Sequence, residues 1–230
     1  LDQFEVINLL SFNAPVLGYM SLTITNLALY CGLIATIIVS LHLLGNNDAK
    51  LIPSKWSILL ESFFASINSM VKEQINKEIY LPFIYSLFFF ILVANLIGNV
   101  PYSFTITTSV IVSIGLSFTI LVGVTILGLS IHKIHFFSFF VPSGTPLLLT
   151  PLLVLIEVIS YLARAFSLGI RLFANVVAGH TLLKILSTFL FKMFSSGLII
   201  FILTLLPFGL FLAITGLELA VSFIQAYVLT

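Results

Sequence analysis

A few polar side chains interrupt the apolar last third of the chain, and their types and spacing could move protons. Glu157, Arg164 and Arg171 follow one another at intervals of seven residues, so a helix would carry all three on one face. Asn175 lies four residues beyond Arg171 and joins that face. His180 lies nine residues beyond Arg171, about half a turn away around the helix axis. Carboxyl and imidazole groups can bind and release protons near neutral pH when burial shifts them, whereas a guanidinium stays charged.

The segment that follows carries a matching pair of polar side chains. Glu218 and Gln225 lie seven residues apart and would also share one helix face. If the two segments fold back on each other about a turn near residue 198, Arg171 lies level with Gln225 and His180 lies level with Glu218. This register predicts two polar pairs between neighbouring helices.

The surroundings of Arg171 predict a mechanism. An arginine at the centre of a bilayer costs about 2.5–3.5 kcal/mol on insertion scales, and no carboxylate lies four residues from Arg171 or level with it. We therefore expect its counter-charge on another chain. A fixed cation between Glu157 on one side and the His180–Glu218 pair on the other would block a direct proton leak. It would also make a passing carboxylate ionise, which predicts two half-channels that meet at the arginine.

The composition places these residues in a membrane. Hydrophobic residues make up 60% of the 230 residues and charged residues only 7%, against about 25% charged residues in a typical soluble domain. The chain is therefore predicted to be an all-α polytopic membrane protein. The net charge of +1 gives no reason to expect nucleic acid as a partner, and Cys31 alone cannot form an internal disulfide. The beginning of the chain lacks the basic residues of a signal peptide, and we expect it to have been trimmed.

Hydropathy defines the elements that must position the polar residues. We predict a single membrane domain over 1–230, built from a transmembrane helix at 22–44, an amphipathic interfacial helix at 53–79, a transmembrane hairpin at 80–100 and 107–130, and two long helices at 150–194 and 196–230. The amphipathic helix could instead face solvent in a loop. The last two segments would be roughly 67 and 52 Å long as straight helices, longer than a bilayer core. They must therefore tilt or break, and Pro207 with Gly209 offers a bend in the second.

The lysines set the expected orientation of the chain. All lysines before the long helices fall on one side of the predicted spans: Lys50, Lys55, Lys72, Lys77 and Lys133. Because the positively charged loops stay on the side of synthesis, the N-terminus is expected on the opposite side.

Two stretches of the last third of the chain resemble a known protein family. The stretch SLGIRLFANVVAGH, a glutamate fourteen residues before its arginine, and LELAVSFIQAYV near the end closely resemble subunit a (subunit 6) of the F-type ATP synthases. The similarity covers nearly all 230 residues, and the LDQFE start is similar to mitochondrial forms of fungi after propeptide removal. The family usually continues beyond AYVLT with a further acidic residue, so the outer mouth of one half-channel is not assigned.

The resemblance implies roles for the residues singled out above. Arg171 corresponds to the stator arginine that faces the carboxylates of the rotating c-ring. His180 and Glu218 correspond to the proton intake side, Asn175 and Gln225 to polar positions beside the arginine, and Glu157 to the exit side. The resemblance also implies a mitochondrial inner membrane location and, as partners, the c-ring, the peripheral-stalk subunit b, other Fo subunits and membrane lipid. The sequence has no GxxxxGK(S/T) nucleotide motif, so we expect no enzymatic activity of the chain alone, and no cofactor is expected.

Other interpretations remain open from the residues alone. A secondary transporter would show inverted repeats, and a scaffold subunit of a respiratory complex would not need an arginine without a counter-charge. Arg164 is a second-line candidate that could simply neutralise Glu157, and Lys184 and Lys192 are expected to reach toward headgroups. The scattered histidines lack metal-ligand spacing, so no metal site is expected. A series of small residues serves either helix packing or a smooth surface for a rotating neighbour: Ala165, Gly169, Ala174 and Ala178.

Overall fold

The computed structural model describes residues 5–13, 21–45, 53–74, 78–100, 103–141, 149–195 and 198–229. The helices are α1 (Asn26–Gly45), α2 (Lys55–Gln74), α3 (Leu81–Gly98), α4 (Val110–His132), α5 (Thr150–Phe194), α6 (Leu198–Leu203) and α7 (Leu205–Leu229), with short 3-10 helices η2 (Glu78–Tyr80), η3 (Ile106–Thr108) and η4 (Lys133–Phe140). Two strands precede them, β1 (Asn8–Asn13) and β2 (Ser21–Thr25). The predicted all-α membrane class is confirmed, with this small hairpin as an addition.

Five helical segments are long and apolar enough to cross a membrane within the described residues: Asn26–Gly45, Leu81–Gly98, Val110–His132, Thr150–Phe194 and Ile200–Leu229. The chain forms two compact units. The first contains Leu1–Ile106 and Gly179–Thr230, and the second contains Thr107–Ala178. The boundary falls within α5, so the residues singled out by the sequence are divided between the units.

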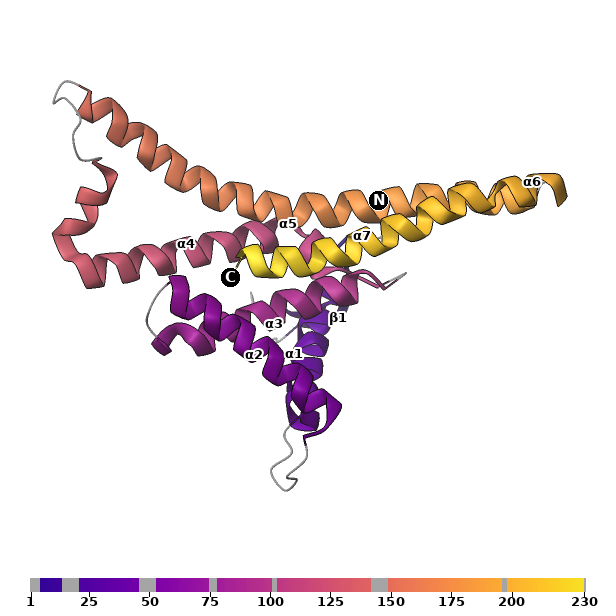
Figure 1. Cartoon of the computed structure of the whole chain (residues 1–230), viewed down its shortest axis with the longest axis horizontal. Helices are drawn as coiled ribbons and strands as arrows, with labels where there is room; N and C mark the ends of the chain where they lie inside the picture. Colours follow the sequence, from indigo (N-terminus) through magenta and orange to yellow (C-terminus); the bar gives the residue numbers. More distant parts are fainter. Residues whose placement is uncertain are drawn as a thin grey trace. The chain divides into compact units, whose positions relative to one another are not determined.

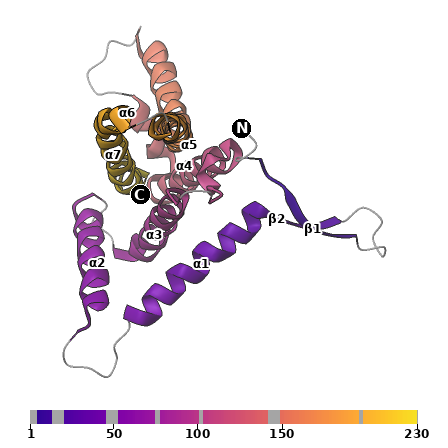
Figure 2. The ribbon, with the colours of Figure 1, turned by 90° about the vertical axis from the view of Figure 1, so that its right-hand side faces the viewer.

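The N-terminal hairpin was not anticipated, because its residues had no regular pattern. β1 and β2 pair antiparallel with a shift in register between Asn8 and Leu10, and Figure 2 shows them beyond the start of α1. Asn26 joins the hairpin to the helix, since its Nδ2 donates to the Glu5 carbonyl at 3.0 Å and its Oδ1 accepts from the Ile7 amide at 3.3 Å. The first span therefore begins at Asn26 rather than at residue 22, because the preceding residues belong to a strand.

Helix α3 is the central element of the first unit. It contacts α1, α2 and α7, and its buried side chains include Phe88, Phe89, Ile91 and Leu92. Phe63 of α2 packs against the rings of Phe88 and Phe89. Helices α3 and α7 run in opposite directions along their contact (Figure 1). The apolar pattern of both helices explains this packing, since each buries one face against the other.

The two long segments differ in continuity. Helix α5 is unbroken over 45 residues, whereas the last segment is interrupted at Thr204, between α6 and α7. Pro207 lies four residues after Leu203 and three after Thr204. A proline ring collides with the carbonyl four residues earlier and lacks an amide donor, so the interruption falls just before the proline rather than at Gly209. Thr204 is fully buried and its hydroxyl donates to the Ile200 carbonyl at 2.6 Å.

Candidate functional site

One face of α5 in the second unit carries the predicted charged residues. Arg171 and Asn175 are exposed, and so are Glu157 and Arg164 toward the start of the helix. The neighbouring Leu172 is only 3% exposed, so the polar residues lie on a different side of the helix from its buried contacts. This exposed face could meet a second molecule along its length.

The opposite side of α5 is held against α4. The Ser117 hydroxyl donates to the Ala165 carbonyl, and a Cβ on Gly169 would lie 3.0 Å from the Ile114 Cα and 3.2 Å from the Ser113 carbonyl oxygen. A side chain at this position would require the backbone of α4 to shift by a few tenths of an ångström, so glycine favours the close approach of the two backbones. The packing fixes the rotation of α5 and so directs the charged face away from α4.

The small residues of α5 therefore fall into two groups. Ala165 is 7% exposed and Gly169 is buried against α4, so helix packing accounts for both of them. Ala174 and Ala178 are exposed. These two remain candidates for a smooth outer surface.

The first unit holds the carboxylate of Glu218 against the backbone of α5. A Cβ on Gly179 would overlap Glu218 Oε1 and would stand 2.7 Å from its Cδ. The imidazole of the next residue, His180, hydrogen-bonds with the backbone of Gly98 at the end of α3. The structure thus brings Glu218 to the residue beside His180, and three helices meet around these two titratable groups.

Side chains of α3 and α7 extend this polar cluster. Asn99 Nδ2 donates to Ser222 Oγ at 3.0 Å, and the Ser222 hydroxyl donates to the Glu218 carbonyl at 2.9 Å. Gln225 lies one turn further along α7 and is 5% exposed. Sequence reasoning missed Asn99 and Ser222. Their signal was an uncharged polar residue inside an apolar span, which is weaker than a charge.

The predicted pairing of Arg171 with Gln225 joins residues of different units and stays a prediction. So do the roles of Glu157, Arg164 and Asn175. Within the part of the chain that the structure describes, no group of three or more His, Cys, Asp or Glu side chains could hold a metal ion.

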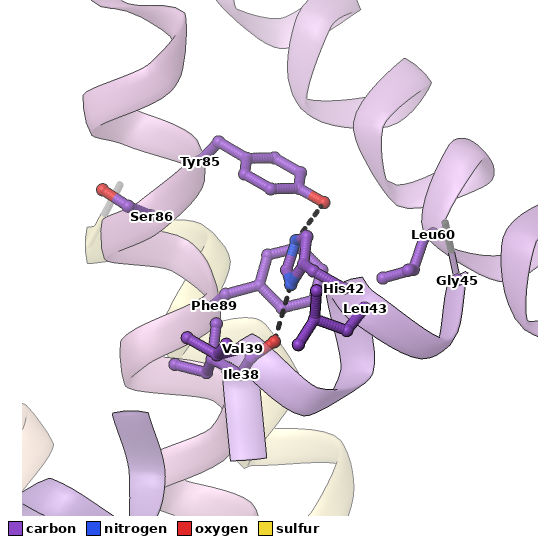
Figure 3. Close-up of a pocket in the computed structure, with 9 residues that line it drawn as sticks. All are labelled: Ile38, Val39, His42, Leu43, Gly45, Leu60, Tyr85, Ser86 and Phe89. Atoms are coloured by element: carbon purple, nitrogen blue, oxygen red, sulfur yellow. Dashed lines mark hydrogen bonds between the residues drawn. The ribbon is translucent and has the colours of Figure 1, made fainter. Parts of the chain in front are cut away.

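A cavity of about 640 Å³ lies apart from this cluster, at the junction of α1, α2 and α3. Figure 3 shows His42 between two hydrogen-bond partners inside it. Its Nδ1 contacts the Ile38 carbonyl at 2.8 Å, and its Nε2 contacts the Tyr85 hydroxyl at 3.0 Å. Because a carbonyl only accepts, Nδ1 carries a proton and Nε2 can accept from Tyr85. The other lining side chains are mostly apolar, including Val39, Leu43, Leu60 and Phe89.

Comparison with known proteins identifies the family of the chain. Residues 28–230 match the family model described as ATP synthase A chain. The chain is 66% identical to ATP synthase subunit a of Mycosarcoma maydis over 99% of its length and 91% of the relative. It is 52% identical to ATP synthase subunit a of Emericella nidulans, with 99% and 90% covered, and 44% identical to that of Marchantia polymorpha, with 100% and 92% covered. The chain belongs to the ATP synthase subunit a family.

Proposed function

We propose that this chain is the proton-translocating stator subunit of the Fo sector of ATP synthase, in the mitochondrial inner membrane. Its role would be to pass protons to and from carboxylates on a rotating c-ring, so that proton flow drives ATP synthesis. The observation that carries this proposal is Arg171, an exposed arginine on α5, a long helix of a membrane protein. Charged residues at such positions of membrane helices are kept for function, and the exposure of Arg171 lets a carboxylate on a neighbouring ring approach it.

Each half-channel has its own residues in this proposal. Protons enter beside His180 and Glu218, move past Gln225 and Asn175, and reach the ring carboxylate next to Arg171. After rotation, protons leave beside Glu157. The arginine keeps the two paths separate, because its positive charge repels a proton that would hop directly between them. It also favours the ionised form of the ring carboxylate as this passes.

The orientation of the chain follows from its lysines. Lys55, Lys72 and Lys133 belong to the side of synthesis by the positive-inside rule, so the N-terminus faces the intermembrane space. The other partners that we propose are the peripheral-stalk subunit b, further Fo subunits and membrane lipid. Many large apolar side chains are exposed on the helices, for example Ile111 at 85% and Phe191 at 77%, and such surface needs lipid or protein cover.

The test uses the whole synthase, reconstituted into vesicles with Arg171→Ala. We expect ATP-driven proton pumping and proton-driven ATP synthesis to fall to background while native electrophoresis shows an assembled complex. Arg164→Ala is the matched control, since it removes the same charge from the same helix face seven residues earlier, and it should retain most of the coupled flux. Normal pumping and synthesis by assembled Arg171→Ala would refute the proposal and favour a scaffold role.

A further inference from the structure

Asn95 is a buried amide in the middle of an apolar helix, and the function described so far does not use it. It lies in α3 and is 1% exposed. Neither its Oδ1 nor its Nδ2 has a hydrogen-bond partner among the residues that the structure describes. A side-chain amide can accept two hydrogen bonds and donate two. Buried polar groups are nearly always satisfied, so this amide requires a partner.

The neighbours of Asn95 are fixed by the contact between α3 and α7. Asn99, one turn later, donates to Ser222 Oγ at 3.0 Å. Because the two helices run in opposite directions (Figure 1), the residue one turn before Asn99 lies level with the residue one turn after Ser222. Asn95 therefore lies opposite Ala226, which is fully buried, with Gln225 beside it at 5% exposed. A small side chain faces the amide, and a second amide lies near.

The burial of Asn95 limits what its partner can be. A side chain of another subunit cannot reach a group that is 1% exposed within this chain. A water molecule is small enough to lie beside this buried amide. Polar sites in protein interiors hold water, whereas apolar ones stay dry. Water can also accept from Nδ2 and donate to Oδ1, which meets both needs of the amide.

We propose a water-binding site at Asn95, between α3 and α7, that carries protons from the Glu218 end of α7 toward Gln225. This inference rests on the function proposed above. Glu218 and Gln225 are seven residues apart, roughly 10.5 Å along the helix, whereas one hydrogen bond between oxygens spans about 2.7 Å. Relay groups must therefore connect the two. Ser222 and Asn99 lie level with the middle of this interval, and Asn95, level with Ala226, lies at its Gln225 end. Asn95 is a positioning residue: the water oxygen accepts a proton from the Glu218 side and releases one of its own protons toward Gln225, while the amide holds it in place.

The test compares two substitutions of Asn95 in the reconstituted synthase. Asn95→Leu keeps the number and branching of the side-chain heavy atoms and removes the polar group. We expect proton flux to fall roughly tenfold or more, because the loss of a proton-transfer step costs at least this much. The variant should still assemble, because leucine leaves no buried polar side-chain atom without a partner at this position. Asn95→Ser keeps a hydroxyl and leaves room for water, so its flux should stay within about twofold of the wild type.

The control for these substitutions is a change at a second buried polar residue. Thr107→Val removes another buried polar group without a partner among the described residues, at a position to which the proposal gives no role, and should leave flux unchanged. Normal flux in Asn95→Leu, or equal losses in Asn95→Leu and Asn95→Ser, would overturn the water site. If Arg171→Ala abolishes coupled flux while Asn95→Leu does not reduce it, only this inference fails. If Arg171→Ala leaves flux intact, the proposed function itself fails.

Discussion

The position of the Glu218 carboxylate against Gly179 predicts a large effect of a single methyl group. In Gly179→Ala the new Cβ would overlap Oε1 and stand 2.7 Å from Cδ, where ordinary contacts begin at 3.4 Å. The carboxyl group must therefore retreat by more than about 0.7 Å, because Oε1 lies nearer than Cδ, or turn away. A displacement of about 1 Å in a reacting group can cost roughly a hundredfold in rate, so we expect proton flux to fall between about tenfold and a hundredfold.

The same substitution should not harm the helix. Alanine is favoured over glycine by about 0.8–1.0 kcal/mol in a helix interior, so the variant should assemble normally. The assay is ATP-driven acidification of vesicles together with passive proton uptake through Fo under a potassium diffusion potential. Gly216→Ala is the matched control: it adds the same methyl group to α7, two residues before Glu218, where nothing lies within 4 Å. Its flux should equal that of the wild type.

A compensating change sharpens this prediction. Glu218→Asp shortens the side chain by one methylene, which would free the space that the methyl group of Gly179→Ala occupies. The double variant should therefore recover part of the flux that Gly179→Ala loses. Wild-type flux in Gly179→Ala would refute the reasoning, because it would mean that protons do not depend on the position of this carboxylate.

The remaining predictions concern packing away from the proposed proton path. Ser117→Ala removes the hydrogen bond to the Ala165 carbonyl and should lower the stability of the subunit by about 1 kcal/mol. Thermal unfolding in detergent would measure the loss of stability. The control is Ser130→Ala on the exposed side of α4, which should have no effect. Equal stability of the two variants would contradict the packing of α4 against α5. His42→Phe removes the 3.0 Å contact with Tyr85 and should lower the stability of the subunit by a similar amount. Proton pumping should not change. Loss of pumping by an assembled His42→Phe complex would instead mean that the cavity around His42 takes part in proton transfer.

The sequence predicted the all-α membrane class, because continuous apolar runs of this length have few other structures available to them. It did not predict the β1–β2 hairpin. A strand is stabilised by a partner elsewhere in the chain, and Asn8–Asn13 shows no regular alternation. It placed a bend near Pro207 but not the exact interruption at Thr204, which depends on the carbonyl that the proline ring displaces.

The candidate site could be predicted only in part, because only some of its residues differ clearly from their apolar surroundings. Charges stand out in apolar helices because each one is costly there, so Arg171, His180 and Glu218 could be singled out. Asn95, Asn99 and Ser222 are neutral, and their importance depends on the helix that each one faces. The closeness of Gly179 to Glu218 likewise follows from packing and cannot be read from spacing alone.

The central claim is that the exposed face of α5 that carries Arg171 contacts a rotating ring of subunits. Site-directed cross-linking tests this claim most directly. Cys31 is the only cysteine of the chain, so Cys31→Ser provides a background without thiols in which Asn175→Cys can carry a benzophenone maleimide. Leu172→Cys, at a position 3% exposed, is the control on the packed side. We predict that light links position 175 to a small carboxylate-bearing membrane subunit and stops ATP-driven pumping, while position 172 gives neither result. Continued pumping after efficient cross-linking at 175, or no such product from an assembled complex, would contradict the account.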